Sequence, residues 1–263
     1  MEHRALVTVD PWIHLKAYTR ARIALGRVGC SLPTHEMLQF GYAHAKARDA
    51  VHAALDVEGL CAQLQAAGFE ALPVRSAARD RASFLLRPDL GRRLDAECVK
   101  RLRQSTRKGY DVLPIVADGL SSVAVREHAL PVLAALRAAF AARWSLGPVV
   151  VATQARVALS DHVGELLQAR LVVMLIGERP GLSSPDSLGI YITYEPRVGR
   201  HDAERNCISN IRPEGMDYDA AARKAGWLVE HALRLGLSGI ALKDDADLGQ
   251  VGAPQRPRSN GEE

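Results

Sequence analysis

The stretch Leu171–Ile211, LVVMLIGERPGLSSPDSLGIYITYEPRVGRHDAERNCISNI, decides the fold that we expect for this chain. Its first run, Leu171–Ile176, is apolar at every position, which is typical of a strand buried on both faces of a parallel sheet. A second apolar run, Leu188–Tyr194, predicts another strand. A long polar segment then extends to Cys207. The stretch therefore predicts two neighbouring strands joined by a loop.

That loop, Gly177–Asp186, is rich in glycine, proline and serine. It follows the carboxyl end of a predicted buried strand, and Glu178 and Arg179 lie at its start. Open α/β sheets bind their ligands outside the carboxyl ends of the strands. The loop is therefore a candidate ligand-binding segment.

Strands and helices alternate on both sides of this stretch. The other expected strands are Phe69–Val74, Ser83–Leu86, Tyr110–Ala117, Pro148–Thr153 and Gly239–Leu242. Helical periodicity covers residues 95–104, 122–144, 161–169 and 218–235. This alternation predicts an α/β fold with a doubly wound, mainly parallel sheet over residues 69–243.

Residues 1–68 are expected to form an N-terminal helical region. Asp10 followed by Pro11 predicts a helix start, and that helix is expected to reach Gly26. A longer helix is expected to begin at Pro33, and a short third one covers residues 60–67. The tail, residues 244–263, has too few apolar residues to pack and is expected to be disordered.

Composition excludes several classes of protein. The chain has 263 residues, of which 48% are hydrophobic and 24% charged, enough to bury a substantial core. Its net charge of +4 comes from scattered arginines, and only 5% of its residues are aromatic, which argues against nucleic-acid binding. No apolar stretch is long enough for a membrane span, and no secretory signal is present at the start. We therefore expect a cytoplasmic protein without membrane contact.

The cysteines and histidines do not indicate a metal site. Cys30, Cys61, Cys98 and Cys207 lie far apart, which predicts reduced thiols rather than disulfides or metal ligands. The phosphate-binding motifs G-x-G-x-x-G and G-x-x-x-x-G-K-[ST] are both missing. No residue lies in an obvious setting for a nucleophile or a general base. We therefore expect any catalysis to depend on a cofactor or a partner chain.

Two candidate positions follow predicted strands. The turn at residues 117–122, ADGLSS, could hold an anion or an amide, although helix capping by Ser121 or Ser122 explains the same residues. Arg156 and Val157 follow the strand that ends near Thr153. An arginine there could bind phosphate or amide oxygens, or could simply be solvated.

Two further candidates lie in the decisive stretch itself. Glu178 in GERPGL would accept hydrogen bonds from a ligand, or would be an exposed carboxylate in a turn. Cys207 in RNCISNI, taken alone, would be a small buried hydrophobic residue.

Several motifs, in this order and spacing, carry a resemblance to a known family. They are DPWIHLKAYTRARIALGRVGCSLPTHEMLQFGYAHAKARDAVHAAL, VADGLSS, ARVALSD, LIGERPGLSSPDSLGIYITYEPR, CISNIRPEG and LGLSGIALK. Together they resemble the small (light) subunit of ethanolamine ammonia-lyase, over about residues 10 to 243.

The resemblance implies an adenosylcobalamin-dependent lyase that converts ethanolamine to acetaldehyde and ammonia. It implies that a large TIM-barrel subunit binds the substrate, and that this chain covers the corrinoid with a Rossmann-like domain in an assembly of several heterodimers. The family's cobalamin contacts carry over to Arg156, Val157, Glu178 and Cys207. No catalytic residue and no metal ligand is expected on this chain.

Two further expectations concern the cofactor and the setting. The D-x-H-x-x-G motif, through which some corrinoid proteins replace the cofactor's own base, is not found, so we expect base-on binding. The segment before Asp10 is short, which leaves residence inside or outside a bacterial microcompartment open. Two other roles also remain open: a nucleotide- or phosphosugar-binding enzyme that acts alone, and a structural partner that does not touch a cofactor.

Overall fold

One mixed β-sheet organises the protein in the computed structural model, which describes residues 6–140 and 143–243. Its strands are β1 (Ala71–Arg75), β2 (Val112–Ala117), β3 (Val149–Thr153), β4 (Leu171–Gly177), β5 (Leu188–Tyr194) and β6 (Arg205–Ile211). They lie in the order β1-β3-β2-β4-β5-β6. The strands β1, β3, β2 and β4 are parallel, whereas β5 is antiparallel to both β4 and β6. The α/β class is confirmed, with a mixed sheet.

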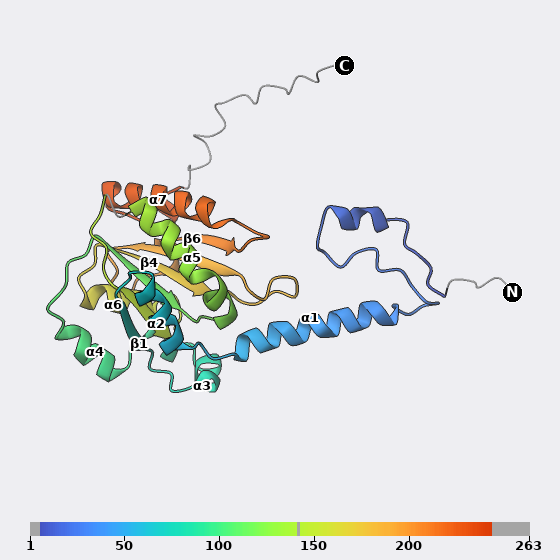
Figure 1. Ribbon diagram of the computed structural model, residues 1–263, viewed down its shortest axis with the longest axis horizontal. Helices are drawn as coiled ribbons and strands as arrows, with labels where there is room; N and C mark the ends of the chain where they lie inside the picture. Colours follow the sequence, from blue (N-terminus) through green and yellow to red (C-terminus); the bar gives the residue numbers. More distant parts are fainter. Residues whose placement is uncertain (1–5, 141–142, 244–263) are drawn as a thin grey trace, which may run out of the picture.

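Helices cover both faces of the parallel part of the sheet (Figure 1). On one face lie α2 (Val57–Ala66) and α5 (Ser122–Phe140), with α7 (Tyr218–Leu235) beside α5 over β5 and β6, and on the other face lie α4 (Ala96–Arg103) and α6 (Leu159–Leu166). Consecutive residues of β4 enter opposite cores: Val172 packs on the side of α6, and Val173 packs on the side of α5. This explains why the strand is apolar at every position.

The N-terminal part differs from the expected helical domain. The helix expected from Asp10 to Gly26 is wrong, because only the short 3-10 helix η1 (Ile13–Ala17) forms there. Asp10 instead accepts a hydrogen bond from the Trp12 N–H at 2.8 Å, and Gly26 has a φ of +74°.

The second expected helix is confirmed as α1 (Thr34–His52), which extends away from the sheet layers in Figure 1. Within the described chain, Ala50 is the only buried residue of α1. The helix therefore has no hydrophobic core of its own. The third expected helix is confirmed as α2, whose Leu60 and Leu64 pack into the core beside the sheet. The described N-terminal residues therefore do not form a separate helical domain.

Two expected strands are wrong. Ser83–Leu86 belongs to the helix α3 (Arg81–Leu86), because Asp80 caps it by accepting a hydrogen bond from the Ser83 N–H at 2.7 Å. Gly239–Leu242 is mostly the 3-10 helix η4 (Gly239–Ala241), whose glycine has a φ of +84°.

One strand was missed. The polar segment that was expected to extend to Cys207 contains the 3-10 helix η3 (Asp202–Glu204) and the start of β6.

The other 3-10 helix is η2 (Leu90–Arg92). The expected disordered tail lies outside the described residues. No helix in the described part of the chain has both the length and the apolar character needed to cross a bilayer.

Candidate functional site

The carboxyl ends of β2 and β4 meet at the centre of one edge of the sheet. The chain leaves β2 through α5 toward β3, and leaves β4 in the opposite direction toward β5. Such a switch point opens a ligand crevice in α/β sheets. Backbones approach closely here: the Leu120 N–H donates to the Gly177 carbonyl at 2.9 Å, and a Cβ at Gly119 would overlap that carbonyl.

Asp118, at the end of β2, shapes the turn that follows β3. Its buried carboxylate accepts hydrogen bonds from the N–H groups of Gln154 at 2.8 Å and Ala155 at 3.1 Å. These bonds hold Gln154 in a left-handed conformation with φ of +52°. Burial raises the pKa of Asp118, whereas the two N–H groups and Arg81 act in the opposite direction. Asp118 therefore positions the residues that come next, which begin with Arg156.

Arg156 lies against an aromatic ring. Its guanidinium carbon is 4.3 Å from the centre of the Phe84 ring, and that of Arg81 is 4.7 Å from the same ring. The Arg156 N–H also donates to the Gly91 carbonyl at 2.8 Å. A Cβ at Gly91 would lie 3.0 Å from both the Phe84 ring and the Arg156 side chain, so the packing favours glycine there. These contacts fix the direction of Arg156.

This part of the edge is positively charged. Burial lowers the pKa of Arg156, and the nearby Arg81, Arg92 and Arg179 lower it further, whereas Asp118 opposes them. Two buried donor atoms, Arg81 Nη2 and Arg156 Nε, have no hydrogen-bond partner within the described chain. Buried donors without a partner are costly, and a bound acceptor would satisfy them. The edge is therefore suited to phosphate or amide oxygens.

Val157 continues the same turn. Its side chain is half-buried and packs against the core between the sheet and α4 and α6. Its carbonyl accepts hydrogen bonds from both the N–H and the hydroxyl of Ser160, at 3.0 and 2.8 Å, as the chain enters α6. The expectation that Arg156 and Val157 follow a strand at the carboxyl edge is confirmed.

Glu178 directly follows β4, as expected, and its side chain reaches over β5. It accepts hydrogen bonds from the Ser187 hydroxyl and, at 3.2 Å, from the Asn210 N–H. A Cβ at Gly189 would lie 2.9 Å from Glu178 Oε1, so glycine at this position leaves room for the carboxylate. Glu178 is therefore a fixed acceptor at the rim of the sheet.

Cys207 lies in β6, opposite Tyr191 of β5. Its side chain is exposed, so the interpretation as a buried hydrophobic residue is wrong. Its Sγ is 3.4 Å from the Ser209 hydroxyl. Burial raises the pKa of Tyr191, and the neighbouring thiol of Cys207 and carboxylate of Glu178 act in the same direction. Gly189, Tyr191 and Cys207 thus share one face of β5 and β6, which we call the open strip.

The four predicted residues lie along one surface rather than in one small pocket. Arg156 follows β3 and Glu178 follows β4, with β2 between them, so about 10 Å separates their strands. Cys207 lies two strands beyond β4, on the open strip. An arrangement of this width suits a broad ligand with polar groups at its rim.

The serine side chains of the turn at residues 117–122 form hydrogen bonds within the protein. The Ser121 hydroxyl accepts a hydrogen bond from the Ala124 N–H at 3.2 Å and donates to the Pro185 carbonyl at 2.8 Å. The Ser122 hydroxyl donates to the Ala53 carbonyl at 2.8 Å. The capping interpretation of Ser121 is therefore confirmed.

One group of side chains has the spacing of a metal site. Ligand atoms of Glu127, His128 and Asp186 lie within 4.8 Å of one another. However, Asp186 already pairs with Arg212 at 2.7 Å, and His128 Nδ1 lies 2.9 Å from the Tyr218 hydroxyl. A guanidinium beside the carboxylate opposes a cation, so the group is explained by internal pairing.

Residues 9–243 match the family model described as ethanolamine ammonia-lyase light chain (EutC). The chain is 54% identical over 252 residues to an ethanolamine ammonia-lyase small subunit from Pseudomonas putida (strain GB-1), covering 94% of this chain and 93% of that protein. It is 53% identical over 255 residues to one from Azotobacter vinelandii, covering 95% and 94% of the two chains. With one from Xanthomonas campestris pv. campestris it shares 56% identity over 242 residues, covering 90% and 89%. The chain therefore belongs to the ethanolamine ammonia-lyase light-chain family, the small subunits of a lyase.

Proposed function

We propose that this chain binds adenosylcobalamin and covers it at the interface with a large TIM-barrel subunit, for the radical conversion of ethanolamine to acetaldehyde and ammonia. Membership of the light-chain family supports the reaction. The name small subunit, carried by the relatives, supports a large-subunit partner for this chain as well.

The observation that carries the proposal is the position of Glu178 beside the open strip. A corrinoid is a wide, mostly apolar disc with amides around its rim, so its site needs a broad surface with a few fixed polar groups. On this strip Cys207 is exposed and Tyr191 is half-buried, and the strip lies beyond the parallel strands that α4 and α6 cover. Glu178 stands at its edge as an acceptor held by Ser187 and Asn210.

Each predicted residue then has a role that its chemistry allows. Arg156, whose Nε has no partner in the described chain, would donate to amide or phosphate oxygens of the cofactor. Glu178 would accept hydrogen bonds from amide or ribose donors, while Val157 and Cys207 would make close contacts with the disc or its side chains.

The division of work between the two subunits follows from these roles. When bound, the coenzyme supplies an adenosyl radical by homolysis of its cobalt–carbon bond. The residues of this chain would orient and shield the cofactor, and substrate recognition would belong to the large subunit.

The finer architecture is part of the same proposal. We infer that residues 69–243 form a Rossmann-like cobalamin-binding domain. We also infer that the chain works in a hetero-oligomer of several heterodimers. We infer base-on binding because the sequence has no D-x-H-x-x-G motif. The assembly would be cytoplasmic, free or within a bacterial microcompartment.

The variant Glu178→Gln in the assembled complex tests the proposal. We expect hydroxocobalamin affinity, measured by equilibrium dialysis, to fall about tenfold, because a hydrogen bond to a charged group is lost. Assembly, measured by size-exclusion chromatography, should be unchanged. The control Glu58→Gln makes the same change at an exposed position of α2 and should alter neither quantity. Unchanged affinity in Glu178→Gln would instead support a purely structural partner.

A further inference from the structure

Arg81, the first residue of α3, is a charged group held inside the protein, with only 13% of its side chain exposed. Burial lowers the pKa of Arg81, whereas the nearby carboxylate of Asp118 acts in the opposite direction. An arginine stays charged even at this depth, and a buried charge needs hydrogen-bond acceptors around it. The acceptors of Arg81 belong to three separate segments of the chain.

The first acceptor lies at the end of α1. Arg81 Nε donates to the Val51 carbonyl at 2.6 Å, and the Ser122 hydroxyl donates to the Ala53 carbonyl beside it at 2.8 Å. The last carbonyls of a helix have no partner within the helix, and a cation at that end also interacts favourably with the helix dipole. Arg81 therefore caps α1 and is itself anchored on that side.

The other acceptors lie in the two turns at the carboxyl edge of the sheet. Arg81 Nη1 donates to the Gly119 carbonyl, in the turn after β2, at 2.8 Å, and to the Gln154 side-chain oxygen, in the turn after β3, at 3.4 Å. It also lies 3.5 Å from the Asp118 carboxylate, which accepts the N–H groups of Gln154 and Ala155. One guanidinium thus joins the turn after β2 to the turn that leads to Arg156.

Arg81 and Arg156 also share an aromatic contact. Their guanidinium carbons lie 4.7 and 4.3 Å from the centre of the buried Phe84 ring, and Arg156 Nη2 lies 3.5 Å from the Phe84 carbonyl. Burial and the charge of Arg81 both lower the pKa of Arg156. Because one ring supports both guanidinium groups and their charges repel, the position of Arg81 limits where Arg156 can lie.

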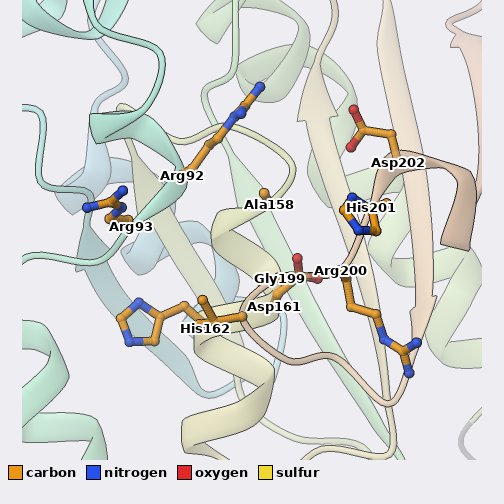
Figure 2. Close-up of a pocket in the computed structure, with 10 residues that line it drawn as sticks. Arg92, Arg93, Ala158, Asp161, His162, Gly199, Arg200, His201 and Asp202 are labelled. Atoms are coloured by element: carbon orange, nitrogen blue, oxygen red, sulfur yellow. The ribbon is translucent and has the colours of Figure 1, made fainter.

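The outer side of the Arg156 turn is open. Ala158, two residues further along, lines a cavity of about 540 Å³, and Figure 2 shows it together with Arg92 and His201 of the same cavity. An open cavity supplies few packing contacts. The position of the turn therefore depends on its contacts with the protein interior, to which Asp118 and Arg81 belong.

We propose that Arg81 is a positioning residue, which sets the turn that carries Arg156 and so acts on the coenzyme through Arg156. The inference rests on the proposed function, in which Arg156 donates to oxygens of the cofactor. Arginine is suited to this role because its planar fork fixes the directions of several donors at once, whereas a lysine ammonium is a point charge on a flexible stem.

A double-mutant cycle on the complex of this chain with its large subunit tests the inference. Hydroxocobalamin affinity would be measured by equilibrium dialysis for Arg81→Gln, Arg156→Gln and the double variant. We expect each single variant to bind about tenfold more weakly, because hydrogen bonds made by a charged group are lost. The double variant should be no weaker than Arg156→Gln alone, because Arg81 acts through Arg156. Arg81→Lys, which restores the charge, should recover part of the loss.

Two further measurements separate positioning from a general loss of structure. Arg81→Gln should raise the KM for adenosylcobalamin and leave kcat at saturating coenzyme unchanged. In the complex without corrinoid, hydrogen exchange should become faster in peptides that cover residues 149–158, where Gln154 and Ala155 donate to Asp118, and not in the other strands. The control Arg87→Gln removes an arginine from an exposed pair with Asp89 just beyond α3, and should change none of these quantities.

Each contrary outcome has its own meaning. Additive losses in the double variant, unchanged affinity in either single variant, or a fall in kcat without a rise in KM would overturn the inference and leave the proposed function intact. Failure of the unmodified complex to bind hydroxocobalamin would overturn both. If Arg81→Gln does not assemble, the same cycle with Arg81→Lys decides the question, since additive losses there would equally contradict action through Arg156.

Discussion

Arg205 of β6 and Asp161 of α6 form a buried, bidentate ion pair, with N–O distances of 2.6 and 2.7 Å. Arg205 also donates to the Thr193 hydroxyl at 3.1 Å and to the Arg200 carbonyl at 3.0 Å. The pair therefore joins the antiparallel strands at one edge of the sheet to a helix that covers the parallel strands. It also fixes the segment before β6 through the Arg200 carbonyl.

Replacing Asp161 with alanine should lower the free energy of unfolding by about 3–5 kcal/mol, because it leaves a buried guanidinium without its partner. The matched change Glu230→Ala removes a carboxylate from a partly exposed pair with Arg143 and should cost less than about 1 kcal/mol. Urea denaturation followed by circular dichroism measures both. Equal costs for the two variants would show that the buried pair does not hold the fold.

His162 should make stability depend on pH. Because burial lowers its pKa from 6.5, the unfolded chain takes up a proton at a higher pH than the folded chain does. The unfolded state then binds more protons, so the free energy of unfolding falls as the pH drops below about 6.5 toward the folded-state pKa. Urea midpoints at several pH values should show this slope, and His162→Gln should reduce it. The control His35→Gln, at an exposed position of α1, should retain it.

Gly189→Ala should separate binding from stability. The new Cβ would lie 2.9 Å from Glu178 Oε1, and the flexible carboxylate can move away at little cost to the fold. We therefore expect a change of less than about 1 kcal/mol in unfolding free energy but weaker cobalamin binding by the complex. Gly226→Ala, where a Cβ would meet only Phe140 at 3.8 Å, is the control for both measurements. Unchanged cobalamin affinity in Gly189→Ala would argue against a contact by Glu178.

Base-on binding predicts that no protein nitrogen coordinates cobalt. Electron paramagnetic resonance of the reconstituted complex in its cob(II)alamin state should show the same superhyperfine splitting with unlabelled and with nitrogen-15-labelled protein. A change in splitting on labelling would mean that a protein side chain has replaced the cofactor's own base.

The parallel core was predictable because burial on both faces leaves a strong signal. The strands β2, β3 and β4 are continuous apolar runs between turn residues, and the expected ranges match them closely. The strand β6 was missed because one of its faces is partly exposed, so its sequence is not a continuous apolar run. In RNCISNI, the fully buried apolar positions are only Ile208 and Ile211, and Asn210 with a φ of +59° breaks the alternation between them.

The site was predictable only in part. Arg156 and Glu178 could be placed at the carboxyl edge because Glu178 directly follows one apolar run and Arg156 lies within three residues of the end of another. The roles of Asp118 and Arg81 could not be predicted, because their hydrogen-bond partners lie more than 30 residues away along the chain. Asp118 stood within a motif that the sequence singled out, but its function is to hold the turn after β3, which no local pattern indicates.

Co-expression of this chain with a candidate large subunit tests the central claim most directly. Acetaldehyde formation from ethanolamine would be measured for each chain alone and for the pair, with and without adenosylcobalamin. The account predicts acetaldehyde only when both chains and the coenzyme are present. Turnover by this chain alone, or by the pair without adenosylcobalamin, would contradict it.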